Sequence, residues 1–154
     1  MQWGDVPVVV INTHIIANYN GDWERRGVFA RMQGKQLRQL ADTVAAQPSN
    51  ALVAVVGDFN IPRGSHLYHD LLQQTGLVDV LAGDLRPTHR PPRGVPAHYS
   101  LPIDFVFTRV PSSLSLQITG DLRFSSKLNL TQKHLDYVSD HNAIEVGFTL
   151  NPSA

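Results

Sequence analysis

The sequence predicts an α/β fold in which a mixed, mostly antiparallel sheet carries helices on one face. Short apolar runs alternate with two segments of helical periodicity through the first half of the chain, and mainly strand-like runs follow. Most of these runs are apolar on both sides, whereas two helices are too few to cover both faces of a sheet. We therefore expect one face to need a further layer, from this chain or from another.

The first expected elements are a strand, a long helix and a second strand. Residues 7–11 are mostly β-branched and are typical of a buried central strand. The helix is expected over residues 23–46, with Asp22 as its N-cap and Pro48 after its end. Residues 51–57, ALVAVVG, are expected to form the second buried strand. The helical spacing is carried by Val28, Phe29, Met32, Leu37, Leu40, Ala41, Val44 and Ala45.

A short helix and a short strand are expected next. Residues 65–76 have helical spacing, with Ser65 as the candidate N-cap and Gly76 at the C-terminal end. Residues 77–81 are expected to form a short strand. Residues 82–102 are rich in Pro, Arg and His and predict a loop.

The last third of the chain predicts three more strands. They are expected over residues 103–108, 113–120 and 143–150, with a long loop from 121 to 141 between the last two. In the first of them, alternation places Ile103, Phe105 and Phe107 on one side and Asp104, Val106 and Thr108 on the other.

Composition indicates one soluble globular domain with no strong net field. The 154 residues suit a single domain, and 42% hydrophobic content is enough to form a core. Thirteen Lys and Arg balance thirteen Asp and Glu, so no net charge attracts nucleic acid or an anionic membrane. No apolar run approaches the roughly 20 residues of a transmembrane segment, and no signal peptide is visible. The absence of cysteine excludes disulfides and thiolate metal ligands, and it leaves the localisation unknown.

Polar residues cluster where the expected strands begin or end. Active sites of sheet enzymes gather at such places, because the rigid sheet positions side chains while the loops admit substrate. The clusters are Asn12 with His14, Asp58 with Asn60, Asp104, and Asp140 with His141.

Asp58 and Asn60 are two residues apart in an extended segment, so they point to the same side. A carboxylate and an amide together suit a hard cation or a phosphoryl group. An Asx-turn in which both residues satisfy their own backbone is an equally good interpretation of this pair alone.

His141 is the candidate general base, and such a histidine needs a carboxylate to fix its tautomer. Asp140 is a poor choice because adjacent side chains in a strand diverge, so Asp104 is the better partner. The plainer alternatives are a turn residue at Asp140 and, at Asp104, a buried carboxylate held by backbone donors. A serine hydrolase is excluded because Ser139, Asp140 and His141 are contiguous, and no H-E-x-x-H motif indicates a zinc protease.

His14 could donate to a phosphate oxygen, although most histidines at strand ends are surface or capping residues. Two basic groups are interpreted as solvated charge. They are Arg86, His89, Arg90 and Arg93 in the loop, and Arg25, Arg26 and Arg31 near the long helix.

Four motifs, NTHI, GDFN, PIDFVF and SDHNAIEV, occur in an order that resembles the endonuclease/exonuclease/phosphatase (DNase I-like) superfamily. This superfamily comprises metal-dependent phosphodiesterases, among them nucleases, inositol phosphatases and neutral sphingomyelinases. The stretches NTHIIANYNGDW and GLVD look most similar to the sphingomyelinase and related lipid-phosphodiesterase branch.

The resemblance implies a role for each matching residue, with magnesium or manganese as the cofactor. His141 would be the general base, and Asp104 would hold its other ring nitrogen. Asp58 would orient the nucleophile or leaving group, and His14 would stabilise charge on the phosphoryl oxygens. The substrate phosphate would be bound by Asn60, His14 and Asn12, and the metal by Asp140.

The resemblance also implies that residues 1–154 are a single partial domain, the C-terminal half of a four-layer α/β/β/α sandwich. The family's principal metal ligand is a glutamate, and neither Glu24 nor Glu145 matches its position. The metal site is therefore expected to be incomplete and the isolated chain to have weak or no activity. The exposed sheet face would bind the missing N-terminal half or a second copy of the chain. A lipid or other small phosphodiester is favoured as substrate, and the alternatives are a DNA or RNA endonuclease and a non-catalytic self-associating fragment.

Overall fold

The computed structural model describes residues 2–151 except 20, 24–26, 92–93, 97–98, 132–133 and 138. Two helices and nine strands are formed within these residues. The elements are β1 (Gln2–Trp3), β2 (Val6–His14), α1 (Val28–Ala45), β3 (Leu52–Asp58), α2 (His66–Thr75), β4 (Val78–Asp79), β5 (Asp104–Arg109), β6 (Leu116–Arg123), β7 (Leu128–Thr131), β8 (His134–Asp136) and β9 (Ala143–Leu150). Neither helix is both long and apolar enough to cross a membrane.

The main sheet has the strand order β1-β2-β3-β5-β4. Only β2 and β3 run parallel, joined by α1 as a crossover helix, and the other neighbours are antiparallel. The predicted α/β class with a mixed, mostly antiparallel sheet is therefore confirmed.

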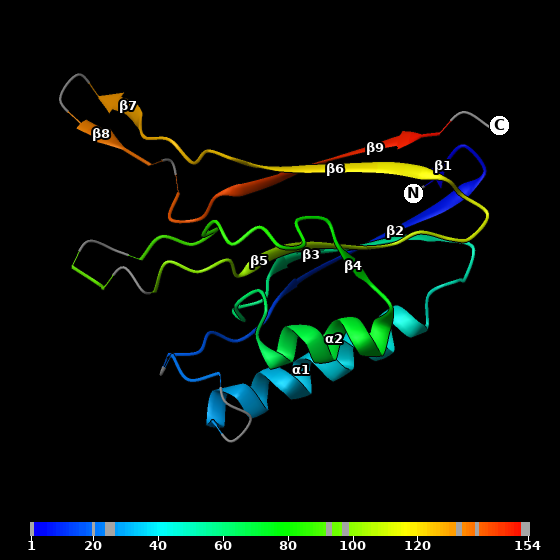
Figure 1. Cartoon of the computed structure of the whole chain (residues 1–154), viewed down its shortest axis with the longest axis horizontal. Helices are drawn as coiled ribbons and strands as arrows, with labels where there is room; N and C mark the ends of the chain where they lie inside the picture. Colours follow the sequence, from blue (N-terminus) through cyan, green and yellow to red (C-terminus); the bar gives the residue numbers. More distant parts are fainter. Residues whose placement is uncertain are drawn as a thin grey trace.

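Both helices cover the same face of the main sheet (Figure 1), as predicted. The core between the helices and the sheet includes Phe59, Phe105 and Phe107, each at most 1% exposed. The Phe59 ring meets the other two edge-on, at centroid distances of 5.4 and 5.0 Å. In β5, Phe105 and Phe107 lie in this core, whereas Asp104 and Val106 are half-buried, in agreement with the expected alternation.

Helix α1 is shorter at its start than the sequence predicts. It begins at Val28, with Gly27 in the N-cap position, so the Asp22 cap is wrong. Trp23 lies before the helix because its indole nitrogen donates to the carbonyl of Asn60 at 3.1 Å. Val28 and Met32, expected on the apolar side, are 57% and 43% exposed. The buried side is formed by Ala30, Gln33, Gly34, Leu37, Leu40 and Val44.

The ends of α2 agree with the prediction. The Ser65 hydroxyl accepts a hydrogen bond from the Tyr68 backbone nitrogen, and Gly76 ends the helix in the left-handed region at φ 64°.

A second, two-stranded sheet of β6 and β9 lies on the side of the main sheet opposite the helices (Figure 1). Its register pairs Ile118 with Phe148 and Leu122 with Ile144, which gathers apolar side chains on one face. The chain thus supplies part of the second layer itself. The layer is partial, because Val10 on β2 remains 54% exposed.

The long loop predicted over residues 121–141 is wrong. β6 continues to Arg123, and β7 and β8 form an antiparallel pair within the remainder. These two strands are only four and three residues long, which is too short to give a clear alternating pattern.

A buried ion pair joins the segment before α2 to β4. The Arg63 Nε atom donates to Asp79 Oδ2 at 2.7 Å, and both side chains are at most 3% exposed. The Tyr68 hydroxyl donates to the same oxygen, and burial together with the Asp79 charge raises the pKa of Tyr68 to about 12. The Leu81 backbone nitrogen donates to Asp79 Oδ1. The carboxylate is therefore almost fully satisfied, and it depends on Arg63 for its counter-charge.

Replacing Arg63 with Leu should lower the free energy of unfolding by about 3–5 kcal/mol, because the Asp79 charge would stay buried without a partner. Arg86→Leu is the matched control, since Arg86 pairs with Asp84 at 2.7 Å on the surface. Urea denaturation of both variants measures the difference. An Arg63→Leu protein as stable as the control would show that the buried pair does not stabilise this fold.

Candidate active site

Three strands of the main sheet meet in a row of polar residues at one end of the sheet, where β2 and β3 end and β5 begins. The register places His14 of β2 opposite Asp58 of β3, and Asp58 opposite Asp104 of β5. His14 Nε2 lies 3.5 Å from Asp58 Oδ2. The Asp58 and Asp104 side chains are 18% and 16% exposed, whereas that of His14 is 74% exposed. Two half-buried carboxylates and one open imidazole therefore share one sheet edge.

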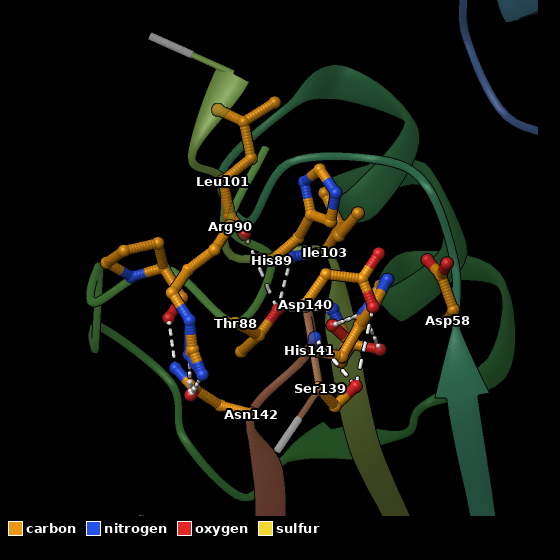
Figure 2. Close-up of polar contacts among 12 residues, drawn as sticks. Asp58, Thr88, His89, Arg90, Leu101, Ile103, Ser139, Asp140, His141 and Asn142 are labelled. Carbon is orange, nitrogen blue, oxygen red and sulfur yellow. Dashed lines mark hydrogen bonds and ion pairs between the residues drawn. The ribbon is translucent and has the colours of Figure 1, made fainter. Parts of the chain in front are cut away.

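His141 joins this row from the segment before β9. Its Nδ1 atom lies 2.9 Å from Asp104 Oδ2 and 3.2 Å from Oδ1. Figure 2 shows His141 with Asp58 to its right. A carboxylate can only accept, so Nδ1 carries the proton and Nε2 of the neutral ring keeps its lone pair. The structure thus brings His141 together with Asp104, which was expected to be the better orienting residue.

The electrostatics of the row act on both its base and its acids. Burial lowers the pKa of His141, but the hydrogen bond and charge of Asp104, with the charges of Asp58 and Asp140, more than offset this, and the pKa lies above its usual 6.5. Burial raises the pKa of Asp58, and the nearby Asp104 carboxylate adds to the rise against the Asn60 hydrogen bond. Two close carboxylates and an imidazole therefore favour a bound proton or cation between them.

Asp58 and Asn60 satisfy one another. The Asn60 backbone nitrogen donates to Asp58 Oδ1 at 2.8 Å, and its Nδ2 donates to Asp58 Oδ2 at 3.1 Å and to the Ile15 carbonyl at 2.9 Å. Asn60 has a positive φ of 50°. The pair is thus a local turn of the Asx kind, as one of the two interpretations predicts, and it also lies in the polar row. The amide donors of Asn60 face the protein rather than open space.

Asn12 lies on β2 two residues before His14 and is therefore outside the row. It pairs in register with Val56 of β3. Within the described residues, Asn12 is not in polar contact with the other predicted site residues.

Asp140 is exposed, and one oxygen of its carboxylate lies 3.4 Å from the Ser139 hydroxyl. One ligand atom from each of His89, Asp140 and His141 lies within 4.8 Å of those from the other two. His89, which was grouped with solvated basic residues, is therefore part of the site. No sequence signal identifies it, because its place depends on a bridge to His141, 52 residues later. Of that basic group, Arg93 lies outside the described residues, as do Arg25 and Arg26.

A cavity of about 480 Å³ opens beside His141 and Asn60. Its volume suits a small ligand, and its walls are mainly apolar and aromatic. The lining residues include Tyr19, Trp23, Val95, Tyr99, Leu101 and Ile103.

The described residues include a candidate site for a hard cation such as Mg²⁺. Ligand atoms of Asp58, Asp104 and His141 all lie within 4.8 Å of one another, and carboxylate oxygens suit Mg²⁺. Asp104 is engaged with His141, and Asp58 with Asn60. Glu145 pairs with Arg123 at 2.8 Å on the β6–β9 sheet and is not a member of this group. The oxygen donors of this group therefore suit a hard cation.

Comparison with known proteins places this geometry in context. The Endonuclease/Exonuclease/phosphatase family model matches residues 3–141. A phospholipase C from Staphylococcus aureus is 25% identical over 108 residues, which cover 63% of this chain and 33% of that protein. The chain thus spans about a third of the curated relatives that it matches.

Solved structures show the same fold. A beta toxin from S. aureus superimposes with a TM-score of 0.66 at 21% identity, covering 91% of this chain and 52% of the toxin chain. A beta toxin mutant with bound magnesium ions gives 0.62 at 22% identity, over 89% and 51% of the two chains. A D. rerio TDP2 complexed with single-strand DNA product gives 0.63 at 21% identity, over 91% and 55%. The chain therefore matches about half of each of these structures.

Replacing Asp104 with Asn should lower the pKa of His141, because both the hydrogen bond to a charged partner and the negative charge are removed. NMR titration of the His141 ring protons in metal-free protein measures the shift. In the parent chain, protonation of His141 raises the free energy of unfolding because the pKa is higher in the folded state. This contribution is fully present below pH 6.5 and is lost as the pH rises through the raised pKa. An unchanged His141 pKa in Asp104→Asn would show that the contact does not exist in solution. Asp70→Asn, on α2, is the control.

Proposed function

The chain belongs to the endonuclease/exonuclease/phosphatase family of metal-dependent phosphodiesterases, and we propose that it carries the general-base half of a phosphodiesterase site. The observation that supports this most directly is the contact between His141 Nδ1 and Asp104 at 2.9 Å beside the Asp58 carboxylate. An imidazole fixed by a carboxylate through one nitrogen offers the other as a base.

In the proposed reaction, His141 Nε2 accepts a proton from water as the water oxygen bonds to phosphorus and the ester bond breaks. The leaving oxygen takes a proton from solvent and departs as an alcohol. Asp104 stabilises the imidazolium that forms and keeps the ring oriented. Asp58 orients the attacking or leaving oxygen, and the exposed His14 donates to a non-bridging phosphoryl oxygen. Asn60 contributes mainly by holding Asp58, since its amide donors are already used.

Asp140 and Asp58 are the residues that would hold Mg²⁺ or Mn²⁺. When bound, the ion would polarise the phosphoryl group as a Lewis acid. We propose that the remaining ligands come from outside this chain, which would form one half of a four-layer sandwich. On this view the isolated chain has weak or no activity, and its counterpart, or a second copy, packs on the partly covered face that includes Val10.

A lipid or other small phosphodiester is the favoured substrate. The balanced charge offers no general attraction for a polyanion, and the cavity beside His141 is mainly apolar. The likeness to a phospholipase C supports the same choice. A nucleic-acid substrate is the alternative, favoured by the fold shared with a DNA-bound TDP2.

Replacing His141 with Ala should lower kcat for magnesium-dependent hydrolysis of sphingomyelin by about 10²–10⁴-fold, because the general base is removed. His69→Ala is the matched control, since His69 is exposed on α2. The assay is run on the chain alone and after mixing with a polypeptide that supplies the other half of the sandwich.

Activity that appears only in the mixture and is lost in His141→Ala would support the proposal. Robust turnover by the chain alone would contradict the incomplete metal site, and equal turnover by both variants would contradict the role of His141. Faster hydrolysis of DNA than of sphingomyelin would favour the nuclease alternative.

A further inference from the structure

The loop before β5 and the segment before β9 are joined by one short antiparallel bridge, with His89 opposite His141. The Arg90 nitrogen donates to the Asp140 carbonyl and the Asn142 nitrogen to the Thr88 carbonyl, both at 2.7 Å. These two bonds flank the histidines. His89 and His141 therefore form a non-hydrogen-bonded pair, the kind in which opposing side chains lie closest. Their ring centroids are 4.9 Å apart.

Each of the two imidazoles is held through Nδ1. His141 Nδ1 contacts the Asp104 carboxylate, and His89 Nδ1 lies 3.3 Å from the Tyr99 carbonyl oxygen. Both partners only accept, so Nδ1 carries the proton in each neutral ring and Nε2 keeps the lone pair. This is the outer-shell arrangement typical of metal-binding histidines, whose second nitrogen donates to a carboxylate or a backbone carbonyl.

A carboxylate completes the group. Asp140 lies next to the pair in Figure 2, and ligand atoms of all three residues are within 4.8 Å of one another. We propose that His89, Asp140 and His141 form a two-histidine, one-carboxylate site for a transition-metal ion of the Zn²⁺ class. Imidazole nitrogen suits Zn²⁺ and Co²⁺, whereas Mg²⁺ prefers oxygen donors such as the Asp58 carboxylate.

The backbone around the site is restrained. The buried Thr88 hydroxyl accepts from the Ile103 and Asp104 nitrogens, and the Arg90 guanidinium donates to Asn142 Oδ1 at 2.6 Å. The backbone that carries the two histidines therefore needs little ordering when an ion binds. The inference does not depend on the proposed hydrolysis, because it concerns binding by the chain without substrate. A transition-metal ion at this site would occupy Asp140 and His141 Nε2 in place of the catalytic roles proposed for them.

Titration of the purified chain with Co²⁺, followed by visible absorption, tests the site directly, and Zn²⁺ competition gives its affinity. We expect one saturable ion per chain, displaced by Zn²⁺ and not by excess Mg²⁺. His89→Ala should weaken Co²⁺ binding at least about tenfold, since loss of a mere outer-shell partner already costs 10–100-fold. NMR should show the ring protons of His89 and His141 shifting together when Zn²⁺ is added.

His69→Ala is the control, because His66 and His69 are three residues apart on α2 and could bind metal by themselves. His89→Gln keeps the size and polarity of the side chain, and far-UV circular dichroism shows whether each variant is folded. The proposal is overturned if a folded His89 variant binds Co²⁺ as tightly as the parent chain, if His69→Ala removes the binding, or if no saturable ion is bound. None of these outcomes depends on phosphodiesterase activity.

Discussion

The candidate site depends on the hydrogen-bonded register of β2, β3 and β5. That register sets His14, Asp58 and Asp104 side by side, and a slip of one residue would turn each of them to the other face of the sheet. Close approach of β2 and β3 is part of this constraint. A Cβ atom on Gly57 would lie 1.9 Å from the Thr13 carbonyl oxygen, so only glycine allows the strands to meet directly before Asp58.

A second constraint brings the end of the chain to this row. Thr88, fully buried, ties the long loop to the start of β5 through its hydroxyl, and its carbonyl accepts from Asn142. The Asn142 amide in turn donates to the Pro87 carbonyl. His141 is positioned by this set of contacts together with Asp104, so the geometry of the base is determined by a loop without regular structure. Thr88 thus joins the backbone of Asp104, through its hydroxyl, to the segment that carries His141, through its carbonyl.

Local signals in the sequence predicted much of the fold. Ser65 and Gly76 delimit α2 correctly because caps act through neighbouring backbone groups. Asp22 is not the cap, because α1 begins only at Val28, and the neighbouring Trp23 donates to Asn60, a contact 37 residues away along the chain. The order of the four motifs indicated the family and the row of carboxylates. His89 was not identified, since its neighbour across the bridge is set by tertiary pairing that no local pattern encodes.

The wide spacing of the site residues has a consequence for the order in which the molecule can be assembled. His14, Asp58, Asp104 and His141 lie in separate segments of one chain, and the last of them comes directly before β9. A ribosome exposes them one after another, so a nascent chain can pair β2 with β3 long before it holds an imidazole at the row. Contacts between such distant segments make folding slow. The proposed site can therefore be complete only after the segment before β9 has been made, and a shorter nascent polypeptide has the β2–β3 pair without His141.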